Sequence, residues 1–209
     1  MARPMRVVFD FGGVLFRWHP PSFLARVWPQ RCPDEAAGAA AAREFFTQYA
    51  GDWGAFDQGL IGPEEVIRRI AARTGWPEAD VRGVVDAVPD ELQAVAGTVA
   101  LIEAAQAAGH RTHYLSNMPG LYADHLEREY PLERWFEGGI FSSRVKHSKP
   151  GAEIFALMEA QLAVPPGDIV FLDDHPDNIE AAAARGWQAI LFTTPEAAAA
   201  AVRERGLIR

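Results

Sequence analysis

Short apolar runs alternate with helix-like segments along the chain, and this alternation constrains the fold more than any other feature. Strand-like runs occupy residues 6–9, 113–115, 169–172 and 189–192. The helix-like segment over 99–108 ends at Gly109, and the one over 179–184 ends near Gly186. Strands that alternate with helices favour parallel pairing through helical crossovers. The pattern therefore predicts an α/β fold: a Rossmann-like parallel sheet flanked by helices.

A long segment between the first two strand-like runs predicts a small inserted α-helical cap. A crossover between parallel strands needs only about a dozen residues or a little more, and this segment is far longer. Pro63 followed by two acids is typical of a helix start, and Gly75 can end that helix. Pro77 starts another helix, which Pro89 should stop. We expect a core of residues 1–16 and 97–209 and a cap of residues 17–96.

Composition narrows the possible partners. The 209-residue chain is 49% hydrophobic, which excludes a disordered protein. Its net charge of −8 is unlike that of a nucleic-acid binder, which typically carries a basic surface. A small polar substrate or a metal ion is therefore the expected partner. Cys32 is the only cysteine, which excludes an internal disulfide. No apolar run reaches membrane-spanning length, and we expect a cytoplasmic location. The sequence does not indicate an oligomeric state.

The first strand-like run delivers a carboxylate to its end. Asp10 follows Val8-Phe9 and precedes Phe11-Gly12-Gly13, where the two glycines bend the chain. A carboxylate at the C-terminal end of a parallel strand lies where such sheets bind ligands, and a nucleophile or metal ligand is its natural role. A turn residue before a Gly-Gly bend is the alternative. This segment alone does not decide between them.

A second acidic group follows the third strand-like run. Asp173 and Asp174 are adjacent, with Asp177 shortly after them. Neighbouring carboxylates repel unless a cation joins them, and oxygen ligands of this kind suit Mg²⁺. Capping of the following helix is the alternative, but it does not require three acids. We favour a metal site.

Two further segments carry groups suited to an anion. Ser116 and Asn117 end the second strand-like run, where a hydroxyl and nearby N–H groups can bind phosphate or simply cap a helix. Lys149 precedes Pro150, which restricts the backbone and can aim the lysine at a site. A solvent-exposed lysine is the alternative, and Lys146 is a second candidate.

Taken together, these motifs resemble the haloacid dehalogenase-like hydrolase superfamily. The resemblance rests on the Asp10-Phe11-Gly12-Gly13 pattern, Leu115-Ser116-Asn117, Lys149-Pro150, and Phe171-Leu172-Asp173-Asp174 with Asn178, in this order over nearly the whole core. Within the superfamily the chain is similar to α-D-glucose-1-phosphate phosphatase-type proteins and to the phosphatase domain of soluble epoxide hydrolases. Residues 53–61 resemble the start of their helical cap.

The resemblance implies a Mg²⁺-dependent phosphatase that hydrolyses a small phosphorylated metabolite, such as a sugar phosphate. Asp10 would be the nucleophile and form an aspartyl-phosphate. The Asp10 side chain, the Gly12 carbonyl and Asp174 would hold Mg²⁺, with Asp173 as a direct or water-mediated partner. The resemblance also implies that Ser116, the Asn117 amide and the catalytic Lys149 bind the phosphoryl group. Asn178 would lie behind them and orient Lys149.

One position departs from the family pattern. Typical phosphatases of the family carry a second Asp two residues after the nucleophile for proton transfer, a contribution of about 10² to 10⁴ in rate. Gly12 stands there. The glucose-1-phosphatase-like relatives also lack this Asp, and substrate groups, water or a cap residue are candidate substitutes. His19 follows the motif closely and is a further candidate, with a structural role as its alternative. Two alternatives follow: a 2-haloacid dehalogenase-type hydrolase, and a non-catalytic regulatory protein that binds phosphate and metal.

Overall fold

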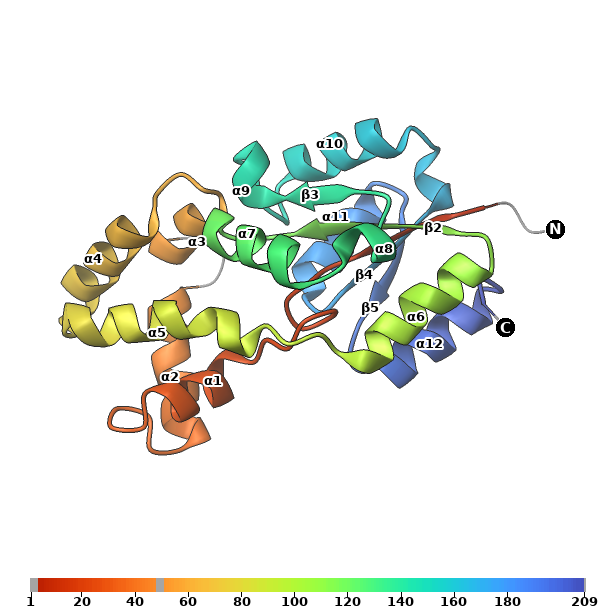
Figure 1. Cartoon of the computed structure of the whole chain (residues 1–209). Helices are drawn as coiled ribbons and strands as arrows, with labels where there is room; N and C mark the ends of the chain where they lie inside the picture. Colours follow the sequence, from red (N-terminus) through yellow and green to blue (C-terminus); the bar gives the residue numbers. More distant parts are fainter. Residues whose placement is uncertain (1–3, 48–50, 209) are drawn as a thin grey trace.

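The computed structural model describes residues 4–47 and 51–208 and contains a five-stranded, fully parallel sheet (Figure 1). The strand order is β3-β2-β1-β4-β5. This confirms the predicted Rossmann-like sheet. The edge strand β3 was not predicted, because three residues are too few to show a strand period. The strands are β1 (Arg6–Phe9), β2 (Arg111–Ser116), β3 (Gly139–Phe141), β4 (Ile169–Asp173) and β5 (Gln188–Leu191).

Alternate residues of the central strands face opposite sides of the sheet, and each side is covered by its own helices. Val7 and Phe9 pack in the same cluster as Leu101 of α6 and Val202 of α12. Val8 packs instead in a second cluster that contains residues of α10 and α11. Burial on both faces explains why these strands read as continuous apolar runs. The core helices are α6 (Ala96–Ala107), α7 (Gly120–Glu129), α8 (Leu132–Trp135), α9 (Ser142–Val145), α10 (Ala152–Leu162), the 3₁₀ helix η1 (Pro166–Asp168), α11 (Pro176–Ala184) and α12 (Pro195–Glu204).

In the described part of the segment between β1 and α6, five helices form the inserted cap, which Figure 1 shows grouped to one side of the sheet. They are α1 (Pro20–Val27), α2 (Glu35–Phe46), α3 (Asp52–Asp57), α4 (Pro63–Thr74) and α5 (Glu78–Glu91). The boundaries at 16/17 and 96/97 stay a prediction, and the predicted ranges include residues 1–3, 48–50 and 209, which lie outside the described residues.

The two connections between core and cap run side by side. Arg17 N donates to Gln93 O over 2.9 Å, and Val95 N donates to Leu15 O over 2.8 Å. Between these bonds, Phe16 and Ala94 form an antiparallel bridge. The cap is therefore joined to the core by a short two-stranded ladder rather than by two independent linkers.

Helix α5 continues past the residue where we expected it to end, and a hydrogen bond near its end joins the cap to the core. Pro89 does not stop the helix, which continues to Glu91. Proline has no N–H to offer the carbonyl four residues earlier. That carbonyl, Val85 O, instead accepts a 2.9 Å hydrogen bond from the hydroxyl of Tyr122 on α7. A core residue thus satisfies the group that Pro89 leaves open.

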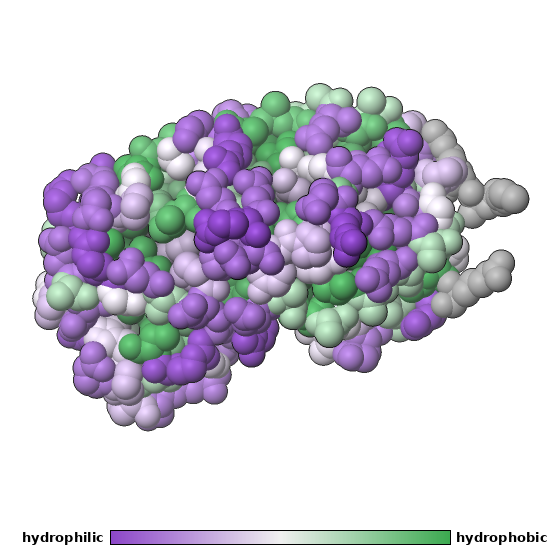
Figure 2. Space-filling view, in the orientation of Figure 1, coloured by the Kyte–Doolittle hydropathy of each residue, from purple (hydrophilic) through white to green (hydrophobic). Residues whose placement is uncertain are grey.

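The surface of the cap is polar where Figure 2 displays it. Hydrophilic side chains cover much of its helices, and hydrophobic ones occur in small groups between them. Several aromatic side chains of the cap are instead buried, with Phe45, Trp53 and Phe56 each under 10% exposed. Among the described residues, no helix has both the length and the apolar character needed to cross a membrane.

Phe11 joins the first motif to the core. Its ring lies 4.9 to 5.8 Å from the rings of Phe16, Tyr114, Phe136 and Phe141, and it is fully buried. We expect Phe11→Ala to lower the free energy of unfolding by about 3 to 5 kcal/mol, because it leaves a cavity in this cluster. Leu121→Ala, at a position 46% exposed, should change it by less than about 0.5 kcal/mol. Urea unfolding measures both, and equal effects would contradict the prediction.

Candidate active site

The sheet brings the predicted polar residues together at one edge. Asp10 follows β1, Ser116 ends β2 and Asp173 ends β4. These three strands are neighbours, with β1 in the middle, and all point the same way. Asp10 N continues the ladder by donating to Leu172 O over 2.9 Å. Side chains from distant parts of the sequence therefore meet at the carboxyl ends of the strands, where open α/β sheets bind ligands.

Lys149 lies between two carboxylates at this edge. Its Nζ is 2.8 Å from Asp10 Oδ1 and 2.6 Å from Asp173 Oδ2, and the side chain is only 1% exposed. Burial alone lowers the pKa of this lysine, but the charges of Asp10 and Asp173 outweigh it and hold the pKa above its ordinary value. Lys149 is therefore a permanent cation beside Asp10. Lys146, the second candidate, is exposed and donates instead to Gly59 O over 2.6 Å.

Asp173 is held by several donors in addition to Lys149. Asn178 Nδ2 lies 2.9 and 3.0 Å from its two oxygens, and His175 N donates to Oδ1 over 2.8 Å. These contacts occupy both oxygens of a fully buried carboxylate. Asp173 thus fixes Lys149, and Asn178 acts on Lys149 through it.

Asn117 also positions Lys149, through the main chain. Its Oδ1 accepts from Lys149 N over 2.8 Å, and its Nδ2 donates to Lys149 O over 2.9 Å. Both polar atoms of the side-chain amide are therefore engaged in hydrogen bonds with Lys149. The main-chain N–H of Asn117 is the group of this residue that can bind an anion. The neighbouring Ser116 hydroxyl is buried and has no hydrogen-bond partner within the described part of the chain. A buried polar group in that state is suited to a ligand or an ordered water.

Three carboxylates form an acidic cluster. Oxygen atoms of Asp10, Asp173 and Asp174 lie within 4.8 Å of one another, and Asp174 is the solvent-exposed member. Burial raises the pKa of Asp10 to about 8; Lys149 opposes this rise, while Asp173 and Asp174 add to it. Partial loss of water on the side of Asp174 that faces the protein, together with the charge of Asp173, also raises the pKa of Asp174. One lysine does not balance three acids, so these residues could hold a divalent cation.

The Gly12-Gly13 bend places the cluster under the cavity. Phe11 N donates to Asp10 Oδ1 over 2.7 Å at its start. Gly13 has φ +74°, and a Cβ there would lie 2.4 Å from Asp174 Oδ2. Gly12 needs no such conformation, and a Cβ there would meet Trp18 at an ordinary 3.5 Å. Only Gly13 is therefore required by the backbone and by the acid beside it.

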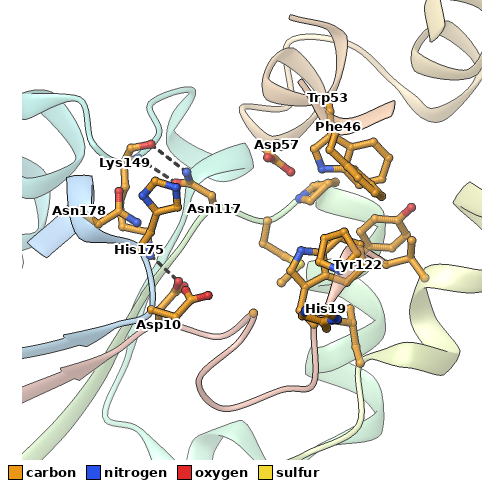
Figure 3. A pocket seen from close by; sticks show the side chains of 18 residues that line it. Asp10, His19, Phe46, Trp53, Asp57, Asn117, Tyr122, Lys149, His175 and Asn178 are labelled. Atoms are coloured by element: carbon orange, nitrogen blue, oxygen red, sulfur yellow. Dashed lines mark hydrogen bonds and ion pairs between the residues drawn. The ribbon is translucent and has the colours of Figure 1, made fainter. Parts of the chain in front are cut away.

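A cavity of about 390 Å³ lies above these residues, between the core and the cap. Figure 3 shows Asp10, Asn117, Lys149 and Asn178 on one side of it, with Phe46, Trp53 and Asp57 on the cap side. Gly12 and Asp174 also line it. The rest of the wall is mainly apolar and includes Trp18, Phe46, Trp53, Val88, Leu92, Met118 and Tyr122, with His19 and His175 as its other titratable side chains.

Asp57 is an acidic pocket residue that the sequence analysis did not identify. It ends α3 and is a single acid in the segment 53–61, and nothing in that segment shows that it faces Asp10. His19, the candidate we did name, also lines the cavity. Its ring is 61% exposed and contacts the hydroxyl of Ser22 at 2.6 Å.

The fold and the site together define an α/β protein with a carboxylate cluster and a buried lysine at the carboxyl ends of its parallel strands. A model of the haloacid dehalogenase-like hydrolases matches residues 5–186, and the chain belongs to this family. It is similar to the sesquiterpene phosphatase astK of Aspergillus oryzae, with 24% identity over 89% of this chain and 88% of that protein. It is also similar to flavin mononucleotide hydrolase 1 of Arabidopsis thaliana, with 24% identity over 74% and 62% of the two chains.

A solved structure shares the fold. A family enzyme of Bacteroides thetaiotaomicron, crystallised with magnesium and inorganic phosphate, superposes with a TM-score of 0.67. The match covers 91% of this chain and 95% of that one at 21% identity. The family match and the phosphatase relatives establish a haloacid dehalogenase-like hydrolase with phosphatase homologues.

The two glycines of the bend should respond differently to substitution. Gly13→Ala forces a positive φ on alanine and pushes against Asp174, so we expect it to lower the free energy of unfolding by about 1 to 3 kcal/mol. Gly12→Ala has room for its methyl group and should change it by less than about 0.5 kcal/mol. Thermal and urea unfolding compare the pair. Equal stability of the two variants would show that the bend is not constrained as described.

Proposed function

We propose that the protein is a Mg²⁺-dependent phosphatase that hydrolyses a small phosphorylated metabolite through an aspartyl-phosphate on Asp10. The observation that carries the proposal is the ion pair of Asp10 with the buried Lys149, inside an acidic cluster at the floor of the cavity. Phosphoryl transfer depends on positioning and charge neutralisation, and this arrangement supports both. The phosphatase relatives agree with it.

The residues of the site have separate roles in the proposed reaction. Asp10 attacks phosphorus, because its carboxylate faces the cavity from the end of β1. Lys149, Ser116 and the main-chain N–H of Asn117 neutralise the oxygens of the transferred group. Asp173 and Asn178 keep Lys149 in place. Water then releases phosphate from Asp10.

The donor set fits a magnesium ion. The side chains of Asp10 and Asp174 and the Gly12 carbonyl would hold it, with Asp173 as a further or water-mediated partner. When bound, the cation neutralises phosphate charge and the repulsion between the acids. The Bacteroides thetaiotaomicron enzyme was crystallised with magnesium and phosphate, which supports this part of the proposal.

The cavity wall would contact the organic part of the substrate and so limits its chemical character. Trp18, Phe46, Trp53 and Tyr122 give it a chiefly apolar and aromatic character, which favours an organic group with apolar surface. A sugar phosphate, which the resemblance suggested, needs hydroxyl-binding groups, and this wall provides few. The name of one relative, a sesquiterpene phosphatase, agrees with a less polar substrate.

The proposal predicts phosphate release that depends on Asp10 and on metal. Wild-type protein with Mg²⁺ should release phosphate from a panel that contains isoprenyl, aryl, nucleotide and sugar monophosphates. Asp10→Asn should lower kcat by at least about 10³-fold, because the amide is a far weaker nucleophile. Its oxygen can still accept from Lys149, so the variant should fold, which thermal unfolding checks. Removing Mg²⁺ with EDTA should abolish turnover reversibly.

The same panel separates the alternatives. Metal-independent release of halide from a 2-haloacid would identify a dehalogenase-type hydrolase. Stabilisation by phosphate compounds without any turnover would instead indicate a binding protein. Either result would overturn the phosphatase proposal.

Magnesium should bind more tightly as pH rises. The raised pKa of Asp10, about 8, means that the metal-free folded protein holds a proton that the unfolded chain releases near pH ~4. Stability of the metal-free protein therefore falls as pH rises between these values. Because the cation binds the deprotonated form, the increase in Tm caused by Mg²⁺ should be larger at about pH 8 than at about pH 6.

Asp174→Asn should remove most of this Tm increase, because it deletes one of the carboxylates of the cluster. Asp177→Asn, at an exposed position in the first turn of α11, should leave it intact. A Tm increase of equal size in both variants would argue against a metal ion at the cluster.

A further inference from the structure

The proposed reaction, on which this inference rests, needs a proton donor that the first motif does not contain. An organic group leaves phosphorus as an oxyanion unless a positioned acid protonates it. Gly12 has no side chain to do so. Because the phosphoryl group lies on the core side, near Asp10 and Lys149, the leaving oxygen points toward the cap. The donor must therefore face the cavity from that side.

Asp57 meets this requirement by its place in the fold. It is the last residue of α3, it lines the cavity, and Figure 3 shows it on the cap side, across from Asp10. Its own main chain is fastened to the core: Asp57 O accepts a 2.5 Å hydrogen bond from the hydroxyl of Ser142. That hydroxyl in turn accepts from Met118 N over 2.9 Å, beside the phosphate-binding segment.

A second contact holds the same end of α3. Lys146 Nζ donates to Gly59 O, two residues after Asp57, over 2.6 Å. Gly59 has φ +63°, and a Cβ there would lie 2.8 Å from Ser143 O, so glycine permits the close approach of α3 to α9. Asp57 thus belongs to the cap in sequence but is fixed to the core. This is the rigid placement that a catalytic acid requires.

The surroundings of Asp57 favour its protonated form. Burial raises the pKa of this carboxyl well above its usual range, and the negative charge of Asp10 raises it further, whereas Lys149 opposes both. Burial is the largest of these causes and does not depend on the charge state of the acidic cluster. An acid that keeps its proton near neutral pH is suited to donate it.

The other titratable side chains that line the cavity near Asp57 already contact partners of their own. The Tyr122 hydroxyl donates to Val85 O over 2.9 Å. The His19 ring contacts Ser22 and lies 3.8 Å from Glu35, mostly exposed. His175 belongs to the core side, where its main chain binds Asp173 and its ring lies 4.0 Å from Asp177.

We propose that Asp57 is the general acid and base of this enzyme and replaces the family Asp that is absent at Gly12. As Asp10 Oδ bonds to phosphorus and the bond from phosphorus to the leaving oxygen breaks, the Asp57 carboxyl gives its proton to that oxygen, and the alcohol departs. The Asp57 carboxylate then takes a proton from the water that attacks the aspartyl-phosphate. This restores both acids and releases inorganic phosphate.

The test compares two substrates that differ in their need for a proton. Benzyl phosphate and p-nitrophenyl phosphate each place one ring in the cavity, but nitrophenolate leaves readily without protonation and the benzyl alkoxide does not. The ratio kcat/KM reports the steps up to departure of the alcohol or phenol. Asp57→Asn should lower it by about 10² to 10⁴-fold for benzyl phosphate, and by less than about tenfold for p-nitrophenyl phosphate.

The second half-reaction gives an independent readout. Without Asp57 as base, hydrolysis of the aspartyl-phosphate becomes slow for both substrates. Asp57→Asn should therefore show a burst of nitrophenol close to one equivalent per enzyme, followed by a lower kcat. Asp86→Asn, which changes an exposed carboxylate on α5, is the matched control and should behave as wild type on both substrates. Thermal unfolding checks that both variants fold.

The outcomes are distinct. A fall in kcat/KM of equal size for both substrates, or no fall for either, would overturn the assignment of Asp57 while the phosphatase activity of the wild type stands. Wild-type protein that hydrolyses neither these two substrates nor the metabolite panel would overturn the proposed function, and the assignment of Asp57 with it.

Discussion

The buried ion pairs of Lys149 hold the candidate site together. A buried ammonium is costly unless carboxylates and hydrogen bonds compensate it, and Asp10 and Asp173 do so from neighbouring strands. Removing one partner leaves an uncompensated charge at a cost of several kcal/mol. The ends of β1 and β4 and the segment before α10 are therefore fixed relative to one another. Asn117 completes this arrangement by binding the main chain of the same lysine.

Much of this architecture could be predicted from the sequence, because the central strands β1 and β4 are buried on both faces and are marked by apolar runs. Shorter strand-like runs marked β2 and β5, and polar residues follow or end three of these four strands. Parallel neighbours necessarily place such residues at one edge. The edge strand β3 was missed since its three residues show no period. Pro89 was expected to end α5, but Tyr122 compensates for the missing N–H of that proline, and no local pattern reveals this distant contact.

The cap is where sequence reasoning reached its limit. The helix of Pro63–Thr74 could be located from its proline, its acids and Gly75. The side chains that face the cavity could not, because five short helices can pack in many ways over a sheet. Trp53 and Asp57 lie on α3, whereas Phe46 ends α2 and Tyr122 lies on α7, and these residues meet only in the folded protein. The interactions of Ser142 and Lys146 with α3 likewise join residues far apart in the sequence.

The two-stranded connection between core and cap has a consequence for how a ligand is recognised. Hydrogen bonds between residues 15–17 and 93–95 join the two linkers, and Ser142 and Lys146 of the core hold the end of α3. The cap residues that line the cavity are therefore attached to the core both at the linkers and beside Asp57. Fit and reactivity are then not independent properties of the enzyme. A ligand that pushes the cap away from the sheet also strains the contacts that place the acid at the phosphoryl group. Discrimination between substrates is thereby expressed in the rate of reaction as well as in affinity.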